Sequence, residues 1–145
     1  MLQFLYVEIR KNDTRKGFSW NRLDGSHGIL AHVNIKERFK VGKYGVDVDG
    51  FEKEVVPILD VERTDAELFV IDEIGKMECF SEKFVAAVER LFASDKSVLA
   101  TIAKKGTGFI REVKNSPGIK QLTLTCDNRE KIISEISKHL SFLRP

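Results

Sequence analysis

Hydrophobic and polar positions along this chain change their pattern near residue 50. Before that point, apolar segments at 2–10, 17–23 and 28–33 are separated by the clusters NDTRKG and DGSHG. Clusters of Asn, Asp, Ser and Gly between short apolar runs are typical of tight turns that join antiparallel strands. The first third of the chain therefore predicts an antiparallel meander.

Beyond residue 50, strand and helix patterns alternate. Nearly continuous runs of apolar and small residues, as parallel strands buried on both faces require, occur at 67–72, 97–103 and 119–125. Segments with helical character lie between and after them, at 51–59, 79–92, 108–115 and 128–140. This alternation predicts an α/β arrangement for the second part of the chain.

Two of these helices carry start or stop signals. Asp49 and Glu52 have the spacing of a capping box, and Pro57 should kink or shorten the helix that follows. The last helix could be capped by Asp127, with Glu130 three residues further on.

Length and composition limit the class of protein. The chain has 145 residues, of which 42% are hydrophobic and 32% charged, so we expect a single folded domain over residues 1–145. A net charge of only +2 gives no electrostatic reason to expect nucleic acid or a membrane surface as a partner. Two cysteines, together with the lack of a signal peptide or a long apolar run, favour a cytoplasmic protein.

The segment LFVIDEIGKME at 68–78 carries the strongest candidate chemistry. A hydrophobic strand leads directly into Asp72 and Glu73, a pattern of the Walker B type, and parallel strands of α/β folds bind ligands beyond their carboxyl ends. Asp72 could hold Mg²⁺, directly or through water. Glu73 could orient and deprotonate an attacking water. The alternative is a pair of solvated acids at an exposed strand end.

The longer string DEIGKME resembles the signature of a family of P-loop nucleoside-triphosphatases, which includes the cancer-related nucleoside-triphosphatase and its thermophilic relatives. Segment 41–59 is similar to the family's preceding segment, and ATIA, FIREVKN and CDNREKI resemble later landmarks in order and spacing. LYVEIR and RKGF resemble its N-terminal hairpin. The resemblance covers nearly all of the chain.

This resemblance implies a fold and an activity. The expected fold is α/β, a P-loop-type three-layer αβα sheet that is mostly parallel, with an N-terminal antiparallel hairpin or meander. The expected activity is the Mg²⁺-dependent hydrolysis of nucleoside triphosphates such as ATP and GTP to the diphosphate and phosphate.

The family also carries a strand, a Gly-x-x-x-x-Gly-Lys-Thr loop and a helix before the hairpin, and these 145 residues contain no such loop. VGKYG has Tyr44 where a Ser or Thr should reach Mg²⁺, and KKGTGF lacks a Lys after its second Gly, so we interpret both as ordinary loops. We therefore expect an incomplete version of the domain, with weak or no nucleotide affinity of its own and with an exposed sheet edge that favours self-association.

Further residues could complete a phosphate site. Lys76 and Glu78 could face it, and Arg111, on a short helical segment with flexible glycine borders, could act as an arginine finger. Asn128 and Arg129, which follow the last expected strand, could contact a nucleotide base. Each of these residues could also be ordinary surface or the first turn of a helix.

Three functions remain open at this point. In the first, the chain is a nucleoside-triphosphate hydrolase. Asp72 holds the metal ion, Glu73 activates the attacking water, and Arg111 stabilises the charge of the transition state. In the second, it is a catalytically inactive relic that acts as a binding module. In the third, it is a nucleotide or nucleoside kinase, for which no acceptor-binding motif is recognisable in the sequence.

Overall fold

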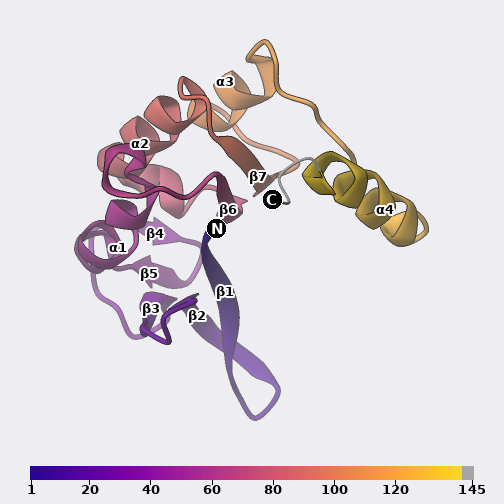
Figure 1. The fold of residues 1–145 in the computed structure, drawn as a ribbon. Helices are drawn as coiled ribbons and strands as arrows, with labels where there is room; N and C mark the ends of the chain where they lie inside the picture. The colour runs from indigo at the N-terminus through magenta and orange to yellow at the C-terminus, as the bar shows by residue number, and fades with distance from the viewer. Residues whose placement is uncertain (142–145) are drawn as a thin grey trace. The chain divides into compact units, whose positions relative to one another are not determined.

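Residues 1–141 of the chain are described by a computed structural model, and residues 142–145 lie outside the description (Figure 1). The chain divides into two compact units, Met1–Ile110 and Arg111–Pro145, which are called the first and the second unit below. Each unit is described by itself.

A sheet of seven strands forms the first unit. Its order is β4-β5-β3-β2-β1-β6-β7, and the strands are β1 (Leu2–Lys11), β2 (Thr14–Arg22), β3 (His27–His32), β4 (Lys40–Val41), β5 (Tyr44–Val46), β6 (Leu68–Ile74) and β7 (Ser97–Ile102). The predicted meander is confirmed, since β1, β2 and β3 pair antiparallel in succession. Figure 1 shows β1 and β2 as a long hairpin that extends beyond the other strands.

The α/β class is confirmed, but the sheet is less parallel than predicted. Only the pairs β1/β6 and β6/β7 are parallel within the described residues, whereas the four other pairs are antiparallel. The reason is that the meander extends through the short hairpin of β4 and β5, so antiparallel strands make up more than half of the sheet.

The helices lie close to the predicted positions. They are α1 (Val48–Glu54), α2 (Glu82–Phe92), α3 (Phe109–Asn115) and α4 (Arg129–Leu140), with short 3-10 turns at Val56–Leu59, Val61–Arg63 and Glu78–Phe80. Pro57 shortens α1 as predicted, because the α-helix ends at Glu54 and continues as a 3-10 turn.

Both predicted helix caps were wrong. The side chain of Asp47, not Asp49, caps α1 and accepts a hydrogen bond of 2.9 Å from the backbone N–H of Gly50. The N-cap position of α4 is Asn128, not Asp127, and the Asn128 side chain makes no cap bond to the helix. Near the start of each helix, more than one Asp or Asn residue could occupy the N-cap position, and the sequence alone does not show which of them does.

Aromatic side chains join the sheet to its helices in the first unit. The ring of Phe4 on β1 lies 6.5 Å from that of Phe51 on α1, and the Phe51 ring lies 5.5 Å from that of Phe84 on α2. All three side chains are fully buried. Leu5 and Val7 alternate with Phe4 along β1, so they face the opposite side of the sheet, and both are exposed. Within the first unit, α1 and α2 therefore cover the Phe4 face.

The prediction of a strand at 119–125 was wrong. These residues have no regular secondary structure, and Leu122 and Leu124 are exposed. A strand is stable only beside another strand that pairs its backbone groups, and the described residues of the second unit contain none.

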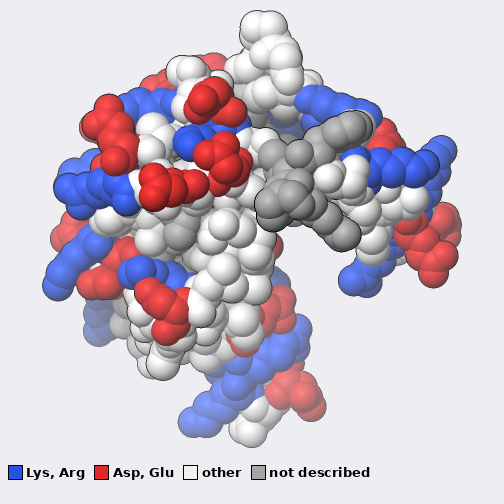
Figure 2. Space-filling view, in the orientation of Figure 1, with Lys and Arg blue, Asp and Glu red and all other residues white. Residues whose placement is uncertain are grey.

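The segment VGKYG forms a tight turn, as predicted. It joins β4 to β5, and Gly42 has a φ of 57°, a left-handed conformation that glycine adopts without strain. The described residues include no helix that is both long and apolar enough to cross a bilayer. On the face shown in Figure 2, acidic and basic side chains are interspersed, and neither sign gathers into one large patch.

Candidate active site

A β-bulge at the end of β6 brings the two predicted acids together. Ile71 pairs with Ala100 of β7 and Ile74 pairs with Ile102, so β6 carries one residue more than β7 across the Asp72–Glu73 step. In a regular strand, consecutive side chains point to opposite faces of the sheet. Here Asp72 and Glu73 both line a single cavity of about 370 Å³.

Asp72 is held where β1 separates from β6. The parallel ladder ends at the pair Phe4 and Ile71, and the next contact is a hydrogen bond of 2.7 Å from the Tyr6 backbone N–H to Asp72 Oδ2. On the other side, the hydroxyl of Thr101 on β7 donates to the Asp72 carbonyl oxygen. One carboxylate oxygen of Asp72 is thus fixed by the backbone of β1, and its orientation is set before any ligand binds.

Glu73 is more exposed and less constrained than Asp72. Within residues 1–141, its carboxylate makes no hydrogen bond and no ion pair. Partial burial raises the pKa of Glu73, and the neighbouring charge of Asp72 raises it further. A raised pKa makes a carboxylate a better proton acceptor near neutral pH, which is the property that a general base needs.

Glu78 lies on the same cavity and is only 3% exposed. Its Oε2 accepts a hydrogen bond of 3.1 Å from the backbone N–H of Gly75. A Cβ atom on Gly75 would lie 2.7 Å from Glu73 Oε1 and 2.8 Å from Glu78 Oε2, so the two carboxyl groups flank this glycine. Burial raises the pKa of Glu78 to about 7, and the charge of Glu73 adds to the rise. Backbone N–H groups, including that of Gly75, and the nearby Tyr6 hydroxyl oppose the rise.

Tyr6 is a residue of this cavity that the sequence analysis missed. Its hydroxyl oxygen is buried and lies close to Glu78, but it is not in hydrogen-bonding geometry with any described residue. Burial raises the pKa of the Tyr6 hydroxyl well above its ordinary value, and the charge of Glu78 adds to this. In the sequence, Tyr6 looks like any aromatic residue on the covered face of a strand, so no local pattern marks it.

The predicted site residues fall into two groups. Asp72, Glu73, Lys76 and Glu78 line the cavity in the first unit. The remaining predicted residues belong to the second unit, where Arg111 and Arg129 are exposed. Their roles stay predictions.

Asn128 has a local structural role in the second unit. Its Oδ1 accepts a hydrogen bond of 2.8 Å from the Thr125 backbone N–H, and its Nδ2 donates one of 2.8 Å to the Thr123 carbonyl oxygen. The side chain therefore closes the turn before α4, and its predicted contact with a base stays a prediction.

The donor set at Asp72 is compatible with Mg²⁺. The described residues contain no group of three His, Cys, Asp or Glu side chains that could hold a metal ion by themselves. Mg²⁺ does not require such a group, because it usually binds one or two carboxylates and completes its shell with water and substrate phosphates. Asp72 has one oxygen engaged by Tyr6 and a second oxygen that could serve as such a ligand.

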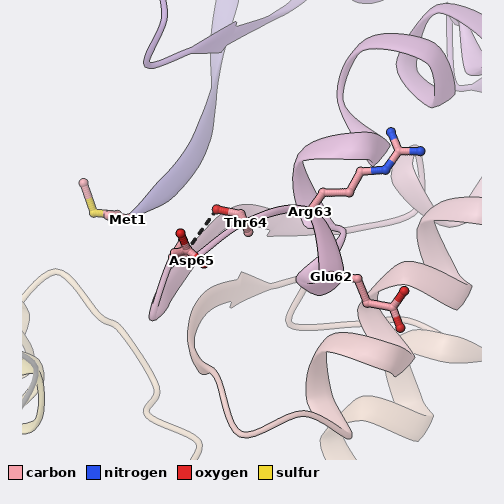
Figure 3. Close-up of a pocket in the computed structure, with 6 residues that line it drawn as sticks. Met1, Glu62, Arg63, Thr64 and Asp65 are labelled. Atoms are coloured by element: carbon pink, nitrogen blue, oxygen red, sulfur yellow. Dashed lines mark hydrogen bonds between the residues drawn. The ribbon is translucent and has the colours of Figure 1, made fainter.

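A second cavity lies away from these acids. It has a volume of about 710 Å³ and is lined by Met1 and residues 62–66 (Figure 3). Glu62 and Arg63 point away from each other there, and Thr64 Oγ1 accepts a local hydrogen bond of 3.1 Å from the Ala66 backbone N–H. Because its polar groups do not converge on one point, it is the weaker candidate despite its larger volume.

Comparison with known proteins decides the family. Residues 3–137 match the model of a family described as NTPase. This chain belongs to that family. The nucleoside-triphosphatase THEP1 of Thermotoga maritima is 38% identical to it over 141 residues, which cover 97% of this chain and 81% of the relative. The human cancer-related nucleoside-triphosphatase is 32% identical over 146 residues, which cover 92% of this chain and 77% of the relative.

A solved structure of the NTPase family confirms the fold. The crystal structure of THEP1 from the hyperthermophile Aquifex aeolicus matches with a TM-score of 0.85 at 32% identity, covering 99% of this chain and 84% of that one. The family resemblance that was inferred from DEIGKME is therefore confirmed.

Proposed function

We propose that this chain hydrolyses nucleoside triphosphates, including ATP and GTP, to the nucleoside diphosphate and phosphate. The observation that carries the proposal is the bulged end of β6, which places Asp72 and Glu73 on the same cavity. Family membership supports it, because relatives over most of the chain bear the name nucleoside-triphosphatase.

Each acid has a separate role in this proposal. Glu73, which has no hydrogen-bond or ion-pair partner among residues 1–141, accepts a proton from the water whose oxygen attacks the γ-phosphorus. The bond from the γ-phosphorus to the bridging oxygen breaks, and the diphosphate leaves. Asp72 would bind Mg²⁺ with its second oxygen, and the bound ion would neutralise phosphate charge as it develops.

Three further roles belong to the same proposal. Lys76 is exposed on the cavity that holds the acids, where its ammonium group would attract phosphate. Arg111 is proposed to stabilise the charge of the transition state as an arginine finger, and Asn128 and Arg129 to contact the base. Each of these three roles can be tested by substitution.

The test is Mg²⁺-dependent release of phosphate from ATP and GTP by the purified 145-residue chain. Glu73→Gln should lower turnover by about 10² to 10⁴-fold, the range expected when a general base is lost. Glu89→Gln, an exposed position on α2, is the matched control and should retain full turnover. Equal turnover in Glu73→Gln and the native chain would refute the role of Glu73, and lack of any Mg²⁺-dependent turnover in the native chain would refute the function.

We also propose that copies of the chain associate through the edge of the sheet. Among the described strands β7 is the last in the order, and it pairs only with β6. Unpaired backbone groups along an edge strand can pair with a strand of another molecule.

A further inference from the structure

The cavity beside Asp72 and Glu73 has two chemically different walls. One wall is polar and consists of the two acids, Lys76 and Glu78. The other wall is largely apolar and comes from the antiparallel strands and the turn after β6; its apolar side chains are Phe18, Leu30, Val41 and Met77. Leu30 is only 1% exposed, so the cavity extends down to the core.

The apolar wall has no role in triphosphate hydrolysis as proposed above. Phosphate, Mg²⁺ and water are all strongly polar, and water that faces an apolar wall loses hydrogen bonds. The cavity volume of about 370 Å³ is within the range of about 300–1,000 Å³ that is usual for small-molecule pockets. The wall is therefore suited to the apolar part of an organic molecule.

The buried hydroxyl of Tyr6 is a second observation that points to a ligand. Buried polar groups nearly always have a hydrogen-bond partner, and this hydroxyl has none among the described residues. Tyr6 lines the cavity, and its hydroxyl lies close to Glu78, which lines the same cavity. The Tyr6 hydroxyl can donate a hydrogen bond to the oxygen of a ligand hydroxyl, whose own proton then remains available to a carboxylate of the cavity.

The charge of the cavity limits the kind of ligand. Glu8 at its rim is neutralised by ion pairs to Arg10 at 2.8 Å and Arg15 at 2.9 Å. The remaining charges are the carboxyl groups of the polar wall and the single ammonium group of Lys76. Because acids outnumber bases, the part of the cavity that Mg²⁺-bound phosphates would leave open favours a neutral or cationic molecule over a further anion.

We propose that this cavity binds a compact organic alcohol and that the alcohol replaces water as the acceptor of the phosphoryl group. The inference rests on the proposed function, because Glu73 would serve both acceptors. The alcohol oxygen forms a bond to the γ-phosphorus, and the bond to the bridging oxygen breaks. The hydroxyl proton passes to Glu73, and the products are a phosphate monoester and the nucleoside diphosphate. Nothing is oxidised or reduced.

Binding can be tested without any turnover. The purified 145-residue chain, labelled at its methyl groups, is titrated with benzyl alcohol and followed by NMR. The methyl signals of Leu30, Val41 and Met77 should shift and saturate, whereas those of Val88 and Leu91 in the buried face of α2 should not. Absence of saturable shifts at the cavity methyls would overturn the proposal.

Two controls test the position of the ligand. Val41→Trp should fill the cavity and weaken binding at least about tenfold, whereas Ile29→Trp should not, because Ile29 is 47% exposed and precedes Leu30, so it faces the opposite side of β3. Benzyl methyl ether, which cannot donate a hydrogen bond, should bind several-fold more weakly than benzyl alcohol. Equal affinity for benzyl alcohol and benzyl methyl ether would overturn the assignment of the ligand to this cavity. Unchanged affinity for benzyl alcohol in a folded Val41→Trp chain would overturn it as well.

The acceptor role is tested with ATP labelled at the γ-phosphate. Labelled benzyl phosphate should form, and its share relative to free phosphate should rise with the same midpoint as the methyl shifts. Phosphate release without benzyl phosphate would overturn the acceptor role and leave hydrolysis standing. Absence of both products would refute hydrolysis and the acceptor role together, and the methyl shifts would then decide on the alcohol site alone.

Discussion

Replacing Glu78 by Gln should make the protein more stable at neutral and alkaline pH. The carboxyl group is almost fully buried and accepts a hydrogen bond from the Gly75 backbone N–H. Gln has nearly the same shape and keeps a carbonyl oxygen that can accept this bond, but it carries no charge. The substitution therefore removes the buried charge and leaves the packing in place.

The magnitude follows from the pKa of Glu78, which burial raises from 4.5 to about 7. The folded state thus holds this proton more tightly than the unfolded state, and stability falls as pH rises from about 4.5 to 7. At about 1.4 kcal/mol for each pKa unit, the native chain loses roughly 3 kcal/mol across this range. Glu78→Gln should equal the native chain below pH 4.5 and exceed its stability by up to roughly 3 kcal/mol above pH 7.

The assay is urea unfolding of both chains at several pH values between 4 and 8. The difference in unfolding free energy should grow with pH and then level off. Glu89→Gln on the exposed surface of α2 is the control and should give a small difference that does not change with pH. A difference that is independent of pH for Glu78→Gln, or that favours the native chain at pH 8, would refute the reasoning.

Four further substitutions or measurements test other parts of the structure. Gly17→Ala should destabilise the fold by about 1–3 kcal/mol in urea unfolding, because its Cβ would lie 2.1 Å from the Ala31 carbonyl oxygen; unchanged stability would contradict this contact. Asp72→Asn should raise the Mg²⁺ concentration needed for half-maximal turnover by about tenfold or more, and an unchanged Mg²⁺ dependence would exclude Asp72 as the ligand. Arg111→Ala should lower turnover by roughly 10³-fold with nucleotide affinity largely retained, and a loss of less than tenfold would exclude an arginine finger. Light scattering should show a mass that increases with protein concentration if β7 pairs between copies, and a constant monomer mass would contradict that association.

Much of the fold could be predicted because its signals are local. Turn clusters separate the first three strands, and the apolar run before Asp72 marks β6. Pro57 ends α1 through its own geometry, and the turn at Gly42 needs only the conformational freedom of one glycine. Such features require no knowledge of distant residues, and all of them are confirmed.

The features that could not be predicted depend on contacts between distant segments. The bulge at Asp72 arises from the register between β6 and β7, which no pattern within β6 reveals. The expected strand at 119–125 has suitable residues but no neighbour in its unit. The raised pKa of Glu78 results from burial, and its position two residues after Lys76 looks like ordinary surface in the sequence.

Strand β1 connects the antiparallel part of the sheet to the acidic pair. It pairs with β2 over nearly its whole length, but its parallel ladder with β6 spans only Leu2–Phe4 against Phe69–Ile71. Immediately beyond that ladder, the backbone of Tyr6 holds Asp72 while its side chain lines the cavity. A shift of β1 by one residue would reverse the faces of its side chains and remove this hydrogen bond at the same time. The short parallel ladder between β1 and β6 can therefore position Asp72 and Glu73 only because the long hairpin with β2 fixes the register of β1.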